Sequence, residues 1–188
     1  MRPRIYLAGP DVFLPDADTV AARKKAICAE HGLVGIFPTD PAPPQDPALP
    51  EHRRIYRANE AHLRAADAVI ANLTPFRGPS ADPGTVYEVG FMRALGRPVF
   101  GYTADARQFA ARSLVHASGT AVRDADGRWR DGEGMFVESF GLIDNLMIDC
   151  GIAESGGAIF VVPAADPWRD TAAFARAAAA CAACLAAR

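Results

Sequence analysis

Short apolar runs alternate with helical patterns along most of the chain. The apolar runs are expected to be buried strands, and they are Ile5–Ala8, Val34–Phe37, Ala68–Asn72, Val99–Tyr102 and Ala158–Val162. Strands that alternate with helices form a parallel sheet whose faces are covered by those helices. The pattern therefore predicts a three-layer α/β fold of flavodoxin-like or Rossmann-like kind, with a five-stranded parallel sheet and flanking helices.

Segments of helical pattern lie between these strands. The expected helices are Thr19–His31, Glu51–Ala65, Thr85–Leu95, Asp105–Leu114, Phe140–Cys150 and an alanine-rich C-terminal helix at about 166–187. For the first of them, Asp18 is the expected N-cap and Gly32 the C-terminal stop. From Thr120 to Val137 the pattern changes, and Asp126-Gly127 between two short strand-like stretches predicts a small hairpin near 120–137.

Alanine shapes the composition more than any other residue. Half of the 188 residues are apolar, and thirteen alanines lie between Ala164 and Arg188. This tail raises the apolar fraction without adding many large core side chains, so we interpret it as a small-residue packing helix outside the chemistry. About 160 residues remain for a core, which suits one domain, and residues 1–188 are expected to form a single one.

Hydropathy, cysteine content and charge exclude several classes of protein. No apolar run approaches the roughly 20 residues that span a bilayer. The first residues carry a strand pattern instead of a signal peptide, which indicates a cytoplasmic protein with reduced thiols at its four scattered cysteines. The net charge is −2 and no run of basic residues occurs, which argues against a nucleic-acid polymer as partner. A small neutral or weakly charged ligand fits this balance better.

The loops after the strands lack the common phosphate-binding and nucleophile motifs. Neither a P-loop, nor G-x-G-x-x-G, nor a G-x-S-x-G elbow occurs in the sequence. The four histidines do not have the spacing of metal ligands. Cys181 and Cys184 lie in the alanine-rich helix, where we interpret them as small packing residues. We therefore expect neither a cofactor nor a metal.

The most informative stretch runs from Asn72 to Gly90, where a loop rich in proline and glycine leads into a helix. Glu88 is expected in the first turn of this helix, where unpaired backbone N–H groups and the helix dipole would keep its carboxylate ionised at neutral pH. Asp82 precedes the same helix, so both carboxylates can face one pocket above the sheet. An alternative stays open, because Thr85-x-x-Glu88 has the spacing of a capping box, in which Glu88 merely accepts from the backbone N–H of Thr85.

Four separated motifs occur in order along the chain. They are Ile5-Tyr6-Leu7-Ala8-Gly9-Pro10, Asn72-Leu-Thr-Pro-Phe-Arg-Gly, Asp82-Pro-Gly-Thr-Val-Tyr-Glu88-Val-Gly90 and Asn145-Leu-Met147. Together they resemble the nucleoside 2-deoxyribosyltransferase family from Ile5 to about Met147. The resemblance implies the α/β fold that the pattern predicts. It also implies that the protein exchanges one nucleobase for another on a 2′-deoxyribose, through a covalent sugar–enzyme intermediate.

The resemblance assigns roles to residues in these motifs. Glu88 matches the nucleophile that attacks the anomeric carbon of the sugar, in the manner of retaining glycosidases. Tyr6 matches the residue that orients this carboxylate, and Asp82 matches the residue that holds a sugar hydroxyl. Asn145 and Met147 match residues that a neighbouring subunit adds to the sugar pocket. We therefore expect a homo-oligomer, at least a dimer.

The nucleobase is expected near the loops that follow the first two strands. Gly9 and Phe13 lie in the first loop, where Phe13 is expected to stack on the base, and Asp40 belongs to the proline-rich loop that borders it. Asn59 stands where some family members carry an aspartate that meets the departing base. An amide can hydrogen-bond a base edge but cannot donate a proton as a carboxylic acid does, so base protonation must come from water or another group.

Two other functions remain open for a chain with these motifs. One is the hydrolysis of the same bond by a related deoxynucleoside 5′-monophosphate N-glycosidase, in which water takes the sugar from Glu88. Such enzymes need a 5′-phosphate site and typically carry small donors where this chain has Asn145-Leu-Met147, so a 5′-hydroxyl is the better expectation. The other is a non-catalytic nucleotide-sensing module, against which the presence of Tyr6, Asp82 and Glu88 argues. The expected partners are deoxynucleosides and free nucleobases, with no nucleic-acid polymer and no membrane.

Overall fold

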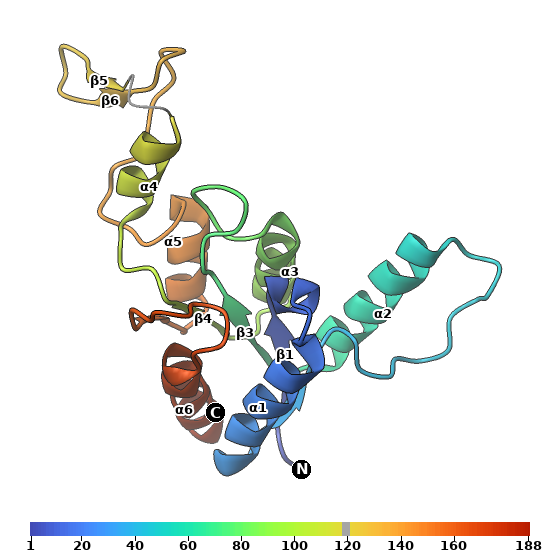
Figure 1. Ribbon diagram of the computed structural model, residues 1–188. Helices are drawn as coiled ribbons and strands as arrows, with labels where there is room; N and C mark the ends of the chain where they lie inside the picture. The colour runs from blue at the N-terminus through green and yellow to red at the C-terminus, as the bar shows by residue number, and fades with distance from the viewer. Residues whose placement is uncertain (118–120) are drawn as a thin grey trace.

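A central parallel sheet organises the molecule, as seen in the computed structural model, which describes residues 1–117 and 121–188 (Figure 1). Its strands are β1 (Arg4–Ala8), β2 (Val34–Ile36), β3 (Ala68–Asn72), β4 (Val99–Thr103) and β7 (Ile159–Val161). They lie in the order β2-β1-β3-β4-β7, and every pairing is parallel, which confirms the predicted five-stranded sheet. The chain reverses its direction across the sheet between β2 and β3. Ligands bind at such a reversal, beyond the carboxyl ends of β1 and β3.

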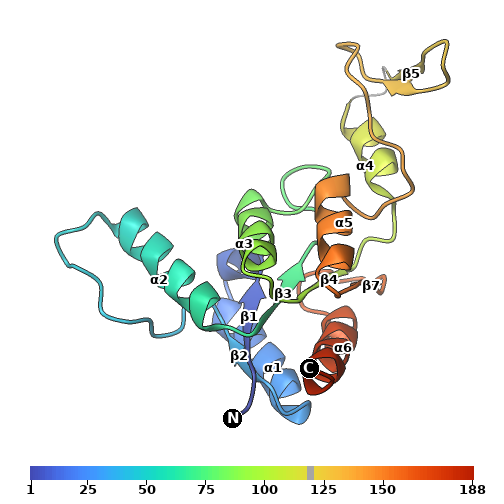
Figure 2. The same cartoon turned by 180° about the vertical axis from the view of Figure 1, so that it is seen from behind.

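Helices cover both faces of this sheet (Figure 2). The helices are α1 (Ala17–Glu30), α2 (Glu51–Ala65), α3 (Pro83–Ala94), α4 (Phe109–His116), α5 (Leu146–Glu154) and α6 (Ala172–Ala186), with a 3-10 turn, η1 (Pro10–Phe13), after β1. Side chains alternate along a strand, so Ile5 and Leu7 pack toward α1 and α6, whereas Tyr6 and Ala8 face α3 and α5. This alternation places Tyr6 on the same face of the sheet as α3, the helix that carries Glu88.

Two extensions leave the body of the protein on opposite sides (Figure 1). One is α2 with the proline-rich loop before it. The other is α4 with the antiparallel pair β5 (Val122–Arg123) and β6 (Trp129–Arg130), which confirms the predicted hairpin. Thr120, the expected start of this excursion, lies outside the described residues. Among the helices that the structure describes, none has both the length and the apolar character needed to cross a membrane.

Several helices begin at other residues than predicted, because side-chain hydrogen bonds fix their first turns. α5 begins at Leu146 and not at Phe140, since Asn145 caps it by accepting the backbone N–H of Met147 at 3.0 Å. α4 begins at Phe109 and not at Asp105, whose carboxylate accepts the backbone N–H of Arg107 at 2.9 Å in a turn before the helix.

The remaining boundary differences are smaller. α1 begins at Ala17, so Asp16 and not Asp18 occupies its N-cap position, and α3 begins two residues before Thr85, at Pro83. The C-terminal helix begins at Ala172, later than the expected residue 166, and a loop precedes it.

The alanine-rich helix α6 is part of the hydrophobic core. One of its faces, formed by Ala173, Phe174, Ala177, Ala178 and Cys181, is buried against α1 and the sheet. The Phe174 ring meets the Tyr102 ring of β4 edge-on, with ring centroids 5.5 Å apart. Small side chains let the helix lie close to the strands, so its alanines serve close packing.

A buried ion pair joins the carboxyl ends of three strands. Lys24 of α1 lies 2.8 Å from Asp11 of η1, and their side chains are only 4% and 2% exposed. The ammonium also donates to the Tyr102 hydroxyl at 2.6 Å. The Asn72 amide, at the end of β3, donates to Asp11 at 3.1 Å and accepts the backbone N–H of Thr74 at 3.1 Å. β1, β3 and β4 are thereby tied to one another beside the expected ligand crevice.

We predict that Lys24→Met destabilises the protein strongly. The substitution leaves the Asp11 carboxylate buried without its cation, and such a loss costs about 3–5 kcal/mol of the free energy of unfolding. The matched control is Arg64→Ala, which removes the exposed pair with Glu60 and should cost less than about 1 kcal/mol. Urea denaturation measures both values. Equal small losses in the two variants would mean that Asp11 is not held as a buried charge.

Candidate active site

The site is built on a hydrogen bond between the sheet and α3. The Tyr6 hydroxyl of β1 donates to Glu88 Oε1 at 2.7 Å, and the Tyr6 side chain is fully buried. Burial raises the pKa of Tyr6, and the nearby Glu88 carboxylate raises it further, so the hydroxyl keeps its proton and remains a donor. The two side chains meet because side chains alternate along β1, which directs Tyr6 toward the face of the sheet that α3 covers.

Burial raises the pKa of Glu88 to about 7, although the hydrogen bond from Tyr6 acts in the opposite direction. The negative charge of Asp82 adds a smaller increase. A carboxylate with this pKa is partly protonated at neutral pH, so the expectation of a fully ionised group is wrong. The expected helix-dipole effect is absent because α3 begins at Pro83 and Glu88 lies beyond its first turn.

The capping alternative for Glu88 is also wrong. The backbone N–H of Thr85 donates to Asp82 Oδ2 at 3.0 Å, and the Thr85 hydroxyl donates to the same oxygen at 3.2 Å. Asp82 therefore caps α3, which leaves Glu88 available to Tyr6. Within the described chain the other carboxylate oxygen of Asp82 has no hydrogen bond, so it is free to accept one from a ligand.

Gly9 closes the end of β1 beside these groups. A Cβ atom at this position would lie 2.5 Å from Asp11 Oδ2 and 2.8 Å from Asn72 Cβ, which no side chain tolerates. The contact exists because the buried Lys24–Asp11 pair draws η1 toward the end of β3. Glycine is thus required here by close approach.

Phe13, Asp40 and Asn59 line one cavity of about 690 Å³ between η1, the proline-rich loop and α2. The Asp40 carboxylate accepts the backbone N–H of Phe37 at 3.0 Å and pairs with Lys25, so it shapes the loop. Phe13 is 61% exposed. Neither Tyr6 nor Glu88 belongs to the lining of this cavity, whereas all three of these residues expected near the base do.

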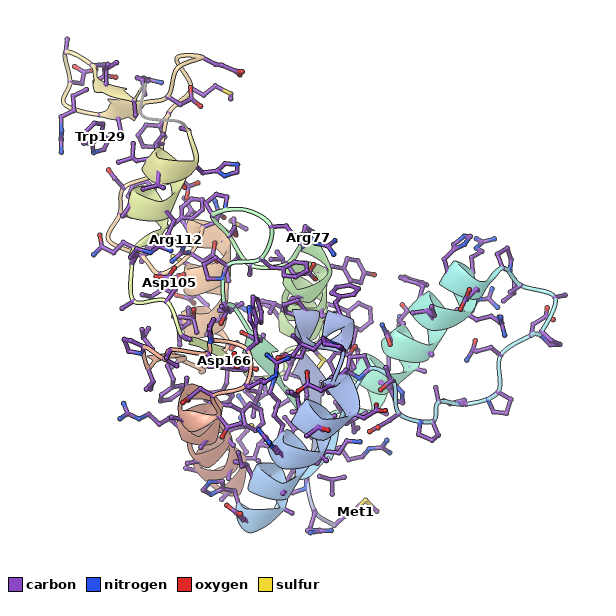
Figure 3. All side chains as sticks on the ribbon, in the orientation of Figure 1. Met1, Arg77, Asp105, Arg112, Trp129 and Asp166 are labelled. Atoms are coloured by element: carbon purple, nitrogen blue, oxygen red, sulfur yellow. The ribbon has the colours of Figure 1, made fainter. Side chains whose placement is uncertain are left out.

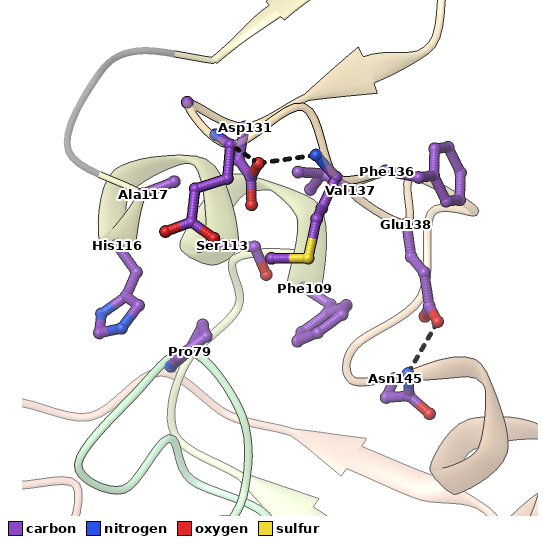
Figure 4. A pocket seen from close by; sticks show the side chains of 13 residues that line it. Pro79, Phe109, Ser113, His116, Ala117, Asp131, Phe136, Val137, Glu138 and Asn145 are labelled. Carbon is purple, nitrogen blue, oxygen red and sulfur yellow. Dashed lines mark hydrogen bonds between the residues drawn. The ribbon is translucent and has the colours of Figure 1, made fainter.

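Asn145 and Met147 lie at the start of α5, and Asn145 lines a second cavity of about 620 Å³ beside α4 and the hairpin extension (Figure 4). The Asn145 amide donates to Glu138 at 2.8 Å while its oxygen caps the helix. Met147 is 74% exposed. These two residues therefore form a third group, apart from the cavity that Phe13 lines.

Buried residues that the sequence analysis missed hold these groups in place. Arg112 donates to the carbonyls of Pro79 and Ile143, and its guanidinium lies 3.6 Å from Asp144, which accepts the backbone N–H of Ala81 at 3.0 Å. The loop before α3 and the turn before α5 are thus fixed to one cation. A charged residue on a helix, such as Arg112, looks solvent-exposed in a sequence, so nothing indicated its burial. For Asp11 and Asn72 there was a signal, because both lie at the carboxyl ends of strands.

Metal binding would need several ligands in one place. No group of three or more histidine, cysteine, aspartate or glutamate side chains is arranged to hold a metal ion in residues 1–117 and 121–188.

Comparisons with known proteins agree with this arrangement. A model of the nucleoside 2-deoxyribosyltransferase family matches residues 5–147. An uncharacterized protein of Schizosaccharomyces pombe is 32% identical over 171 residues, which cover 85% of this chain and 81% of that protein.

Solved structures resemble the fold as well. A 2-desoxiribosyltransferase from Leishmania mexicana matches with a TM-score of 0.58 and 33% identity, covering 78% of this chain and 85% of that one. A conserved protein from Enterococcus faecalis V583 shares the fold at 22% identity, with a TM-score of 0.54 and coverage of 87% and 92% of the two chains.

We predict that ionisation of Glu88 destabilises the fold. Folded Glu88 keeps its proton up to about pH 7, whereas the ordinary value is 4.5. The folded state therefore binds more protons than the unfolded chain between these pH values, and its stability falls as the pH rises through that window. Relative to Glu88→Gln, the wild-type free energy of unfolding should drop by up to about 3 kcal/mol from below pH 4.5 to above pH 7. Urea denaturation across this range measures it. A constant difference between the two proteins would contradict the burial of this carboxyl group.

Proposed function

This chain belongs to the nucleoside 2-deoxyribosyltransferase family, and we propose that it transfers a 2-deoxyribosyl group from one nucleobase to another. The observation that carries the proposal is the 2.7 Å hydrogen bond between Tyr6 and the buried Glu88 carboxyl group. It brings a candidate nucleophile and its orienting donor together at the reversal point of the sheet, where ligands of this fold class bind.

Glu88 is the proposed nucleophile. Its carboxylate oxygen attacks the anomeric carbon of the deoxyribose, the bond from that carbon to the base nitrogen breaks, and the electron pair leaves with the base, which takes up a proton from water. A glycosyl ester of Glu88 results. A ring nitrogen of a second base then attacks the same carbon and gives up its proton to water, while the ester bond breaks to restore the carboxylate. Tyr6 donates to one carboxylate oxygen throughout, which leaves the other oxygen to attack.

The sugar and the base are proposed to contact different parts of the crevice. The free oxygen of Asp82 accepts a hydrogen bond from a sugar hydroxyl, a role that its capping of α3 does not use up. Phe13 offers an exposed ring on which a base can stack. Asn59, on the opposite wall of the same cavity, hydrogen-bonds the base edge. Asp40 borders the base by holding the loop, and Gly9 leaves room for the substrate beside β1.

A second copy of the chain is proposed to complete the site. Asn145 and Met147 lie apart from the cavity that Phe13 and Asn59 line, and Met147 is exposed. Such an exposed thioether is available to pack on a sugar that the neighbouring chain holds. The protein is therefore proposed to work as a homo-oligomer, with each site drawing on two chains.

We predict that the protein converts thymidine and adenine into deoxyadenosine and thymine, which chromatography separates. Glu88→Ala should lower the rate at least about a thousandfold, since it removes the attacking group, and the protein should still fold. Glu60→Ala, which breaks an exposed pair on α2, is the matched control and should keep full activity.

The outcomes of this assay separate the alternatives. Free thymine without deoxyadenosine would identify a hydrolase, and no reaction would favour a non-catalytic module. An active but less stable Glu88→Ala protein would show that the carboxylate serves the fold and not the reaction.

We predict that two defective variants restore each other when they share an oligomer. Glu88→Ala and Asn145→Ser should each be impaired, and serine retains the helix cap. When the two are co-expressed with different tags, a mixed dimer holds one site with both groups intact. Random pairing then gives about a quarter of the wild-type rate. Activity no higher than the sum of the separate variants would contradict a shared site, as would a strictly monomeric active protein.

A further inference from the structure

Three aromatic rings from distant parts of the chain form a contact chain at the carboxyl edge of the sheet. Phe13 stacks on Phe76 with ring centroids 5.7 Å apart and an angle of 11° between the planes. Trp168 meets Phe76 edge-on, at 6.0 Å and 83°. Arg77 lies 4.6 Å from the Phe76 centroid and 5.5 Å from that of Phe13, so its guanidinium covers part of the pair. Phe76 is therefore enclosed between two aromatic neighbours and a cation.

The loop that carries Trp168 is anchored to the body of the protein. Arg169 donates one hydrogen bond to each carboxylate oxygen of Asp16, at 2.9 and 2.8 Å. Asp166 accepts the backbone N–H of Trp168 at 3.1 Å and that of Arg169 at 3.2 Å. Asp16 directly precedes α1, the helix whose Lys24 binds Asp11 in the same turn as Phe13. The indole and the Phe13 ring are thus tied to the same helix.

Phe13 itself has little else to hold it. Its side chain is 61% exposed, and its ring contacts among the described residues are the stack on Phe76 and the guanidinium of Arg77. A ring that must receive a flat ligand needs a fixed orientation, because freezing it on binding would cost affinity. Phe76 can supply this orientation only while its own ring is fixed, and the edge contact from Trp168 does that.

We infer that Trp168 is a positioning residue for nucleobase binding, which acts through Phe76 on the ring of Phe13. The inference rests on the proposed function for the identity of the ligand. It is independent of the family comparison, because Trp168 lies beyond residues 5–147, the part of the chain that the family model matches. The segment before α6 thereby takes part in binding, although the sequence placed the tail outside the chemistry.

The inference is tested by measuring the binding of free adenine by calorimetry. No sugar donor is present, so no reaction takes place during the measurement. Trp168→Ala should raise the dissociation constant about threefold to tenfold, as the loss of one aromatic pair predicts. Trp168→Phe should stay within about twofold of the wild type, since a phenyl ring restores the edge contact. Trp129→Ala is the matched control and should change nothing, because Trp129 lies on the hairpin extension, far from the Asp166 loop and Arg77 (Figure 3).

A double variant separates positioning from a general loss of stability. Phe13→Ala alone should weaken adenine binding, and adding Trp168→Ala to it should weaken binding no further, since the indole acts through that ring. If Trp168→Ala lowers the melting temperature but leaves the dissociation constant unchanged, Trp168 serves the fold only and the inference is wrong. Equal losses from Trp168→Ala in the presence and absence of Phe13 would also overturn it.

The same measurements distinguish this inference from the proposed function. A wild-type protein that binds adenine through Trp168 but transfers no sugar would leave the inference standing and refute the transfer reaction. A protein that transfers sugar while Trp168→Ala binds adenine normally would do the reverse. A wild-type protein that neither binds adenine nor transfers sugar would refute both.

Discussion

The ammonium group of Lys24 is the constraint on which the site depends. It lies in the interior beside Asp11 and Tyr102, and burial lowers its pKa. A buried charge is costly unless it is fully paired, so the ends of β1 and β4 must remain where they satisfy it. Asn72 extends the same arrangement to β3. The close approach that excludes a side chain at Gly9 follows from this arrangement, as does the place of the turn that carries Phe13.

The properties of Glu88 follow from two further constraints. The alternation of β1 directs Tyr6 toward α3, where its hydroxyl meets Glu88, and Asp82 caps that helix, so the helix end does not use the Glu88 carboxyl group. Burial then makes its charge unfavourable, and the Tyr6 hydroxyl offsets part of that effect. The result is a carboxyl group that titrates near neutrality.

The sequence predicts the sheet well because buried parallel strands are continuous apolar runs, which few other elements imitate. It fails at the start of α5, where an apolar stretch continues before the helix. There the Asp149 carboxylate accepts the backbone N–H groups of Ile143 and Asp144, which holds a turn in place of a helix. The motifs single out Tyr6 and Glu88 as candidate site residues, because each motif is a short stretch of neighbouring residues that can be read without knowing the fold. The buried partners of Lys24 come from distant segments, and a lysine on a helix reads as solvent-exposed until the fold is known.

The C-terminal segment shows why motif boundaries and structural boundaries differ. The family match ends at residue 147, yet the edge strand β7 and the helix α6 that covers the sheet lie beyond it. Without α6, the Phe100 and Tyr102 side chains of β4 would lose a large part of their cover, as would Leu7 and Ile70 of the inner strands. The loop between β7 and α6 must therefore cross the carboxyl edge of the sheet, where ligands bind. The contact of Trp168 in that loop with Phe76 follows from this topology, whatever the motifs before it contain.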